Sequence, residues 1–336
     1  PNRCVLCQRC VRVCSEKVGA NTLDFRQRGI QQMISPDAGM PLGKSSCLSC
    51  GACMQVCPTG AITPKDSAYL ERATAVNNRR DELKTISSTC AGCSVGCRTL
   101  VRVFEDRLLS IDADMEAGDA GTLCEGGRFL KLKDNRPRIT RPMVRRDGKL
   151  QETDWKTALA YVAERMQKSV REFGAGSVAG IASPSQPNET LYLFQKMMRA
   201  GVGTGNVDAI GGNAVRMARA ATESLVGENV RAKVEAGISD LDKADLFLII
   251  GADPVKTNPV IGAAVIRGFF NRQAKLVVIN QDETRLGEIA DLNLRPRDGS
   301  EGFLINGMMR TQRWHSTQRF GSIEMCLCDT SKGKLG

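Results

Sequence analysis

The sequence predicts an α+β amino-terminal part organised around clustered cysteines, followed by a doubly wound parallel α/β domain. Twelve of the fourteen cysteines lie within the first 124 residues, in three tight groups, and the spacing of the first group recurs in the second. From about residue 150 onward, short apolar runs alternate with stretches of helical periodicity. The order strand, helix, strand is typical of a parallel sheet with helices on its faces.

Composition divides the chain into five segments. Residues 1–65 hold the first two cysteine groups, and residues 66–88 are polar and charged, which favours a helical linker. Residues 89–135 hold the third cysteine group. Residues 136–310 form the predicted α/β domain, which is incomplete. Residues 311–336 fit neither pattern and are predicted to be an irregular or truncated tail.

The first two cysteine groups share the spacing Cys-x2-Cys-x2-Cys-x3-Cys, and Pro58 follows the second group. This is the signature of a ferredoxin-type pair of [4Fe–4S] clusters, in which the fourth cysteine of each group binds the other cluster. Structural zinc also uses Cys-x2-Cys pairs, but two quartets with a third cysteine inserted at this spacing favour iron–sulfur clusters. The predicted ligands are Cys4, Cys7, Cys10 and Cys57 for the first cluster, and Cys47, Cys50, Cys53 and Cys14 for the second.

The third group predicts a third [4Fe–4S] cluster, held by Cys90, Cys93, Cys97 and Cys124. One such set alone would also fit zinc. Its position directly after two ferredoxin-type clusters favours iron, because a row of clusters makes an electron path. The single histidine, His315, excludes a Rieske centre, which needs two histidines. Cys326 and Cys328 are predicted to be incidental thiols.

The α/β region yields candidate cofactor contacts at the ends of two predicted strands. Its predicted elements are a helix capped by Asp154, a strand at 177–182, a helix capped by Asn188 that Gly201 stops, strands at 245–250 and 275–280, and a helix from about 259 to 272. Ligands of parallel sheets bind beyond the carboxyl ends of the strands. Gly251 and Asp282 follow the last two strands, and they either contact a nucleotide or line an unused crevice.

Composition and charge argue against a nucleic-acid-binding, secreted or membrane-spanning protein. The net charge is +10, with a basic stretch from Arg128 to Lys149, but aromatic residues make up only 4% of the chain and leave few stacking platforms for bases. A solvated basic face or a docking surface for an acidic partner is therefore favoured over a nucleic-acid site. The chain has no secretory signal, and its longest apolar run, around 245–252, is too short to cross a bilayer. We expect a cytoplasmic protein that reaches a membrane only through partners.

The cysteine motifs resemble those of a known family. The segments Arg3–Cys14 and Cys47–Ile62 are similar to the ferredoxin segment shared by the large (G-type) iron–sulfur subunit of respiratory complex I and the alpha subunit of NAD-linked formate dehydrogenases. Cys90–Cys97 and Leu123–Phe129 resemble the [4Fe–4S] domain that opens molybdopterin oxidoreductases, which bind molybdenum or tungsten through bis-molybdopterin guanine dinucleotide. The resemblance extends through α/β segments at 245–259 and 298–308, and covers residues 1 to about 310.

The resemblance implies an iron–sulfur electron-transfer subunit of an NADH-linked, complex I-like (NADH:quinone) oxidoreductase, peripheral on the cytoplasmic side of the inner membrane. Its implied partners are a flavin-containing, NADH-oxidising subunit and other subunits of a redox complex. In such proteins a [2Fe–2S] domain precedes this segment, so a [2Fe–2S] cluster is expected upstream of Pro1.

Two departures from the family argue against a molybdenum or tungsten centre. Active members carry lysine in the pattern Cys-x-Lys-Gly-Arg, where this chain has Gly126. Formate dehydrogenases also place a cysteine or selenocysteine, followed by histidine, midway along the α/β region, and the nearest stretch here, 207–218, has neither. The α/β region is therefore expected to be a scaffold, and no catalytic residue is assigned. The alternative is a molybdopterin-dependent formate dehydrogenase alpha subunit.

Overall fold

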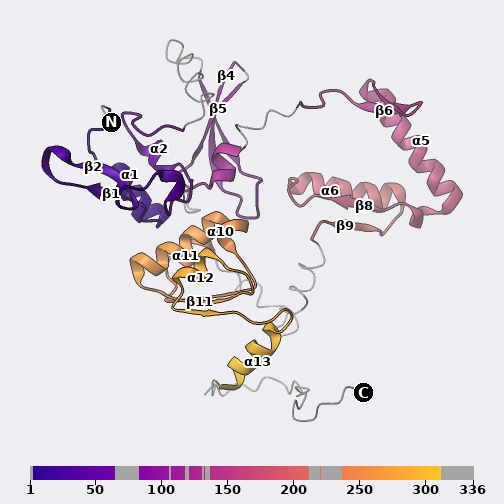
Figure 1. Ribbon diagram of the computed structural model, residues 1–336. Helices are drawn as coiled ribbons and strands as arrows, with labels where there is room; N and C mark the ends of the chain where they lie inside the picture. Colours follow the sequence, from indigo (N-terminus) through magenta and orange to yellow (C-terminus); the bar gives the residue numbers. More distant parts are fainter. Residues whose placement is uncertain are drawn as a thin grey trace.

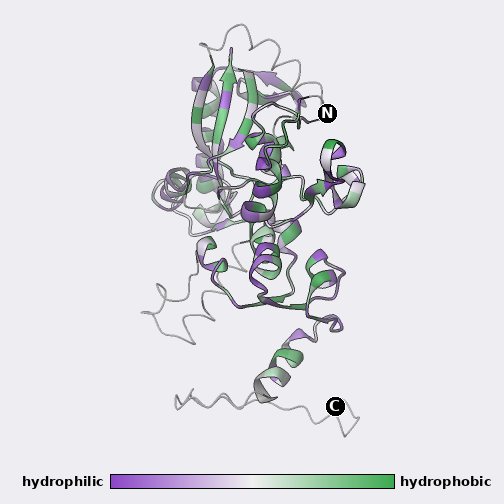
Figure 2. Ribbon diagram, turned by 90° about the vertical axis from the view of Figure 1, so that its left-hand side faces the viewer, coloured by the Kyte–Doolittle hydropathy of each residue, from purple (hydrophilic) through white to green (hydrophobic). Residues whose placement is uncertain are grey.

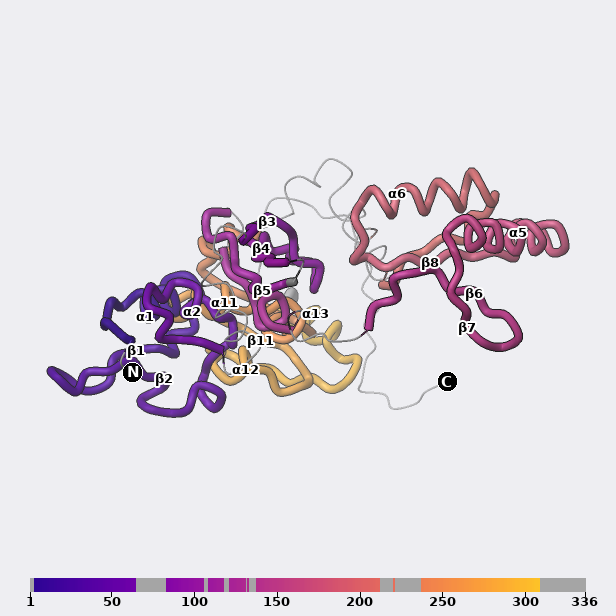
Figure 3. Tube along the Cα trace, turned by 90° about the horizontal axis from the view of Figure 1, so that it is seen from above, coloured from indigo at the N-terminus to yellow at the C-terminus, as the bar shows by residue number. Residues whose placement is uncertain are grey.

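The computed structural model describes residues 3–64, 83–105, 107–117, 121–130, 132, 137–211, 220 and 237–311. The greater part of the predicted linker, His315, Cys326 and Cys328 lie outside these ranges. Figures 1 and 3 both show residues 137–211 to one side of the rest of the molecule. None of the helices within the described ranges is long and apolar enough to cross a membrane.

The first region (residues 3–64) contains two short α-helices, a π-helical turn, three one-turn 3-10 helices and a hairpin. Helix α1 (Arg9–Arg12) continues into a π-helical turn (Val13–Val18), strands β1 (Leu23–Arg26) and β2 (Met33–Pro36) pair antiparallel, and α2 (Ala52–Val56) follows. The sequence repeat is also a repeat of backbone conformation. Leu6 and Gln8 in the first cysteine group have φ of 52° and 65°, and the equivalent Ser49 and Gly51 in the second have 52° and 69°. Both cysteine loops therefore turn through the left-handed region at the same two positions.

The third region (residues 83–132, with the gaps given above) contains a three-stranded antiparallel sheet. The strands are in the order β3 (Lys84–Thr89), β4 (Arg98–Phe104) and β5 (Arg107–Ala113). These strands lie at the top of Figure 2 and carry both hydrophobic and hydrophilic residues. Because β3 begins at Lys84, residues 84–88 belong to this sheet and not to the helical linker predicted for 66–88. Thr85, Ile86 and Thr89 are β-branched, which favours a strand.

Residues 137–211 contain a hairpin and a small parallel unit. Strands β6 (Met143–Arg146) and β7 (Lys149–Glu152) pair antiparallel, and α5 (Trp155–Phe173), β8 (Gly180–Ala182), α6 (Asn188–Lys196) and β9 (Val207–Ala209) follow. The predicted cap is confirmed, since Asp154 accepts a hydrogen bond from the backbone N–H of Thr157 at 2.9 Å.

The prediction for the second helix was wrong at both ends. Pro187 is its N-cap, and Asn188 is already helical. Gly201 does not stop the helical conformation, because a π-helical turn (Met197–Val202) carries the chain past it. Gly203 follows as the C-cap with φ of 81°, a value that glycine adopts without strain.

The last region, residues 237–311, contains the predicted parallel sheet. Strands β10 (Leu246–Ile250), β11 (Lys275–Ile279) and β12 (Leu292–Leu294) are parallel and adjacent in that order, and the predicted helix at 259–272 is confirmed as α11 (Pro259–Arg272). The other helices are α9 (Ile238–Leu241), α10 (Pro254–Thr257), α12 (Arg285–Ile289) and α13 (Glu301–Thr311). Within the described ranges the parallel strands form two separate sheets, β8–β9 and β10–β11–β12. A single doubly wound sheet therefore stays a prediction.

Helix α11 joins three hydrophobic cores. Val260 packs with Cys97 and Leu123 of the third region, Ala263 packs with the first region, and Ile266 packs against its own sheet. The first two turns of α11, residues 259–266, are apolar on all sides, which is typical of a buried position. Arg267 and Asn271 add hydrogen bonds to backbone carbonyls of the first region, those of Lys17 and Ser15. The part of the α/β region at residues 237–311 is thereby held directly against the first region.

Replacing Gly268 by alanine is expected to destabilise the protein by about 1–3 kcal/mol, because this position on α11 has no room for a methyl group. A Cβ here would lie 2.6 Å from Cε2 of Phe247, whose ring is buried in the core under the sheet. The matched control is Gly307→Ala on α13, where a Cβ meets nothing within 4 Å. It should leave the melting temperature unchanged or raise it slightly. Equal melting temperatures for the two variants in a thermal denaturation series would contradict the packing of α11.

Candidate iron–sulfur centres

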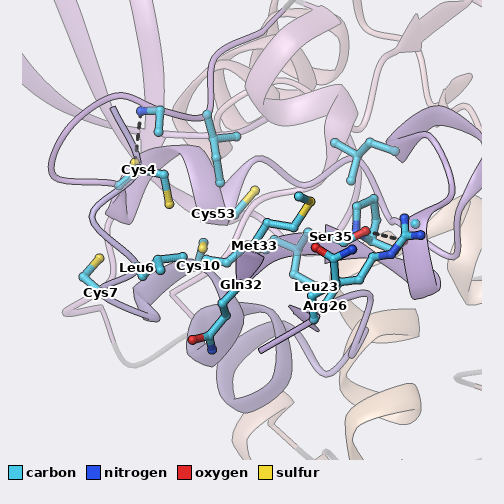
Figure 4. Close-up of a pocket in the computed structure, with 18 of the residues that line it drawn as sticks. Cys4, Leu6, Cys7, Cys10, Leu23, Arg26, Gln32, Met33, Ser35 and Cys53 are labelled. Carbon is cyan, nitrogen blue, oxygen red and sulfur yellow. Dashed lines mark hydrogen bonds between the residues drawn. The ribbon is translucent and has the colours of Figure 1, made fainter. Parts of the chain in front are cut away.

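The first predicted ligand set lines one cavity. Cys4, Cys7, Cys10 and Cys57 border a space of about 1030 Å³ beneath the β1–β2 hairpin, and Cys53 also reaches its wall. Figure 4 shows the labelled cysteines on one side of this cavity and hairpin residues such as Met33 on the other. Burial raises the pKa of the Cys10 thiol, and the nearby thiols of Cys4 and Cys57 raise it further. The fourth cysteine of the second group thus lies with the first three of the first group.

The second predicted set is also brought together, and it is more deeply buried. Burial raises the pKa of the Cys53 thiol to about 12, and the thiols of Cys50, Cys47 and Cys14 add to the rise. The pKa values of Cys47 and Cys50 are raised by the same causes, again with a contribution from Cys14. Cys14 therefore lies with the second group, which is the crossed arrangement that the sequence predicts.

The third predicted set lines a second cavity of about 480 Å³. Cys90, Cys93, Cys97 and Cys124 all border it. Gly127 lies between two of them, since a Cβ there would be 3.3 Å from the sulfur of Cys90 and 3.9 Å from that of Cys124. A side chain at this position would therefore intrude between the thiols.

The three sets form a row. Cys47 of the second set borders the cavity of the third set, together with Arg285. A small space between the two sets is lined by Cys50, Cys124 and residues of α11. Cys53 of the second set borders the cavity of the first set, so these two sets are also adjacent.

The first and third cysteine sets border cavities large enough for cubane clusters. No disulfide bond joins any of the twelve cysteines of the three sets. Around one zinc ion, four thiolates at about 2.3 Å from the metal would have to converge, and no three Cys, His, Asp or Glu side chains in the described ranges converge in this way. In a cubane each thiolate binds a different iron, so its ligands stand farther apart and surround a larger space. Such clusters are held by four cysteine thiolates.

Backbone N–H groups point at several of the sulfur atoms. Ser49 N–H donates to Cys47 at 3.3 Å, Ala61 N–H to Cys57 at 3.2 Å, and Gly127 N–H to Cys124 at 3.4 Å. Burial opposes ionisation of Cys57, but the N–H groups of Ile62 and Ala61 and the Thr59 hydroxyl outweigh it and lower the pKa of this thiol. Hydrogen bonds of this kind stabilise thiolate ligands and help set the potential of a bound cluster.

Gly251 and Asp282 lie at neighbouring strand ends, as predicted. Gly251 N–H donates to the carbonyl of Ile279 at 2.9 Å, and the side chain of Asn280 bridges the two loops through Asp282 N–H at 3.0 Å and the Ala252 carbonyl at 3.1 Å. Neither residue lines either cysteine cavity. Their role as cofactor contacts stays a prediction.

Arg128 is a site residue whose place in the fold differs from the prediction. The sequence groups it with the basic stretch 128–149, for which a solvated face or a docking surface is expected. Its side chain is instead 1% exposed and lies between the second and third cysteine sets. A local sequence feature could have set Arg128 apart from the basic stretch, because it follows two glycines and precedes Phe129 in the segment that starts at Cys124.

Comparison with known protein families identifies the larger part of the chain. Residues 138–313, more than half of the chain, match the molybdopterin oxidoreductase model. The chain belongs to this family. Residues 3–61 match the 4Fe-4S dicluster domain, which agrees with the first two cysteine sets.

Individual relatives extend the match over nearly the whole chain. The NADPH-Fe(3+) oxidoreductase subunit alpha of Geobacter sulfurreducens is 34% identical over 92% of this chain and 35% of its own length. A G-type subunit of the NADH-quinone oxidoreductase of Rhizobium meliloti is 33% identical over 90% of this chain and 33% of its own length. A putative formate dehydrogenase of Staphylococcus aureus is 27% identical over 90% of this chain and 34% of its own length.

Among solved structures, acetylene hydratase from Pelobacter acetylenicus is similar with a TM-score of 0.49 at 18% identity, over 67% of this chain and 31% of that one. The chain spans about a third of the length of the curated relatives it matches.

Proposed function

We propose that the chain is the iron–sulfur electron-transfer part of an NADH-linked oxidoreductase complex, and that it holds three [4Fe–4S] clusters in a row. The observation that carries this proposal is the contiguity of the three cysteine sets, since Cys47 borders the third cavity and Cys53 the first. A bound cubane supplies one-electron oxidation and reduction. The protein holds the ligands, partly buries the second set and donates N–H groups to the sulfur atoms.

The proposed ligand sets are those predicted from the sequence. The crossed positions of Cys14 and Cys57, as judged from the thiols that affect the pKa values of Cys53 and Cys10, support the assignment of the first two clusters. The common cavity of Cys90, Cys93, Cys97 and Cys124 supports the third.

We propose further that the α/β region is a scaffold and carries no molybdenum or tungsten. Gly126, which stands where active family members have lysine, borders the cavity of the third set and offers no side chain there. Helix α11 contributes to all three hydrophobic cores, which supports a structural role. The alternative is a molybdopterin-dependent formate dehydrogenase, favoured by the family match and by the relatives named putative formate dehydrogenases.

The proposed partners are a flavin-containing, NADH-oxidising subunit and the other subunits of a cytoplasmic redox complex, with any membrane contact made by those subunits. Residues 137–149 are mostly exposed and include Arg138, Arg141, Arg145 and Lys149, so they provide a basic surface for an acidic partner.

Metal analysis of the anaerobically purified complex tests this proposal. We expect about twelve iron atoms assigned to each copy of this chain, since three cubanes hold four irons each, and no stoichiometric zinc, molybdenum or tungsten. Low-temperature electron paramagnetic resonance should resolve three reducible clusters. Stoichiometric molybdenum, together with formate-dependent dye reduction that is lost without molybdate, would favour the alternative. Colourless protein with bound zinc would exclude both.

A further inference from the structure

Arg128 is the largest fully buried side chain in the described ranges, and it connects the loops of two cysteine sets. It belongs to the π-helical turn Gly126–Leu130 that follows Cys124 of the third set. Its Nε donates to the backbone carbonyl of Cys50, a predicted ligand of the second set, at 2.7 Å. The side chain of Arg128 therefore connects the turn that follows Cys124 of the third set to the loop of the second set.

The other donors of Arg128 are also used. Nη1 donates to the carbonyl of Ile111 at 3.2 Å and to Oδ1 of Asp112 at 2.8 Å, and Nη2 donates to Oε1 of Gln55 at 2.7 Å. Gln55 itself pairs with Ala113 in both directions, at 2.7 and 3.0 Å. The second cysteine loop, helix α2 and strand β5 are thus held by one continuous set of hydrogen bonds.

Gly51 makes this arrangement possible. A Cβ at Gly51 would lie 2.4 Å from Cδ of Arg128, and the residue adopts φ of 69°. The equivalent position in the first loop is Gln8, which has the same left-handed conformation but carries a full side chain. Only the second loop has the open position that lets the buried cation approach.

We propose that the buried Arg128–Asp112 ion pair raises the reduction potential of the second cluster above the value that the cluster would have without Arg128. The inference rests on the proposed function, since it requires a cluster at Cys47, Cys50, Cys53 and Cys14. Nε of Arg128 contacts the backbone carbonyl of Cys50, whereas Asp112, a residue of β5, contacts a different nitrogen of the guanidinium, Nη1.

The sign of the effect follows from charge. Reduction adds an electron to the cluster, so a nearby cation favours the reduced form and a nearby anion opposes it. Arg128 is 1% and Asp112 5% exposed, so solvent screens this pair far less than a surface pair. Asp112 partly cancels the field of Arg128, and the cluster responds to the difference because the guanidinium is the nearer group. Arg102, which is half exposed, also pairs with Asp112 at 3.5 Å and weakens that opposing charge.

The test is a redox titration of the whole complex, followed by electron paramagnetic resonance, with two variants of opposite expected sign. Arg128→Met removes the cation, and the reduced-to-oxidised ratio of the second cluster at a fixed ambient potential should fall about tenfold, which corresponds to about 59 mV for a one-electron couple. Asp112→Asn removes the opposing charge with little change of shape, and the potential should rise. Arg128→Lys keeps the charge, so the potential should stay near that of the unaltered protein even where the melting temperature falls.

The control is Arg12→Gln, which removes an equal charge from an exposed ion pair next to the first cysteine group. Its effect on the potential of the second cluster should be small because solvent screens this position. Shifts of the same sign in Arg128→Met and Asp112→Asn, no shift in either, or an equal shift in Arg12→Gln would each overturn the inference. An unaltered protein without a reducible second cluster would instead overturn the proposed function.

Discussion

Replacing Cys14 by alanine is expected to remove the second cluster and to leave the first in place, although Cys14 belongs to the first cysteine group in sequence. Burial and the thiol of Cys14 both raise the pKa values of Cys47, Cys50 and Cys53, which places Cys14 with the second set. Alanine cannot bind iron, so the iron content should fall by about four atoms per chain. Metal analysis and electron paramagnetic resonance of the purified complex would measure the loss.

The matched variant is Cys57→Ala, for which the crossed arrangement predicts the reverse result. Cys57 belongs to the second group in sequence but lines the cavity of Cys4, Cys7 and Cys10, so the first cluster should be lost and the second kept. Cys326→Ala should keep all the iron, since that cysteine is predicted to be an incidental thiol. If Cys14→Ala removed the first cluster and Cys57→Ala the second, each group would bind its own cluster and the crossed assignment would be wrong.

The cysteine sets could be predicted because their spacing is itself a geometric constraint. Three thiolates at every third residue can face one cubane only from a backbone that turns tightly, and the structure has these turns at Leu6, Gln8, Ser49 and Gly51. The apolar runs of β10 and β11 and the helix between them are equally local signals. Each of these features is determined by residues close together in the chain.

The contacts between regions could not be predicted in this way. Arg128 looks like one member of a basic stretch, and only its fold-dependent neighbours Cys50, Gln55 and Asp112, 78, 73 and 16 residues away, give it a buried position. The apolar pattern of residues 259–266 in α11 indicates burial, but it does not say which regions cover the helix. The end of the second helix depended on a π-helical turn, which moved the stop from Gly201 to Gly203. These outcomes depend on packing between distant segments, for which a single sequence carries no direct signal.

Replacing Leu276 by alanine is expected to destabilise the protein strongly, because the side chain lies in the core of the parallel sheet. Leu276 lies on the central strand β11, is 0% exposed, and belongs to the core formed with Phe247, Val265 and Ile266. Leucine-to-alanine changes at such positions cost about 2–5 kcal/mol, because they lose buried apolar area and leave a cavity. The melting temperature of the anaerobic protein should fall accordingly.

The matched control is Leu246→Ala, one strand away in the same sheet. Leu246 is 57% exposed, so little apolar area is lost and the melting temperature should change little. Loss of visible absorbance from the clusters should begin at a lower temperature in Leu276→Ala than in Leu246→Ala. The reason is that α11, which packs on Leu276 through its own core, also contributes Ala263 and Val260 to the cores beside the second and third cysteine sets. If the clusters were lost at the same temperature in both variants, the sheet would not support the cysteine loops, and the scaffold role proposed for the α/β region would have to be given up.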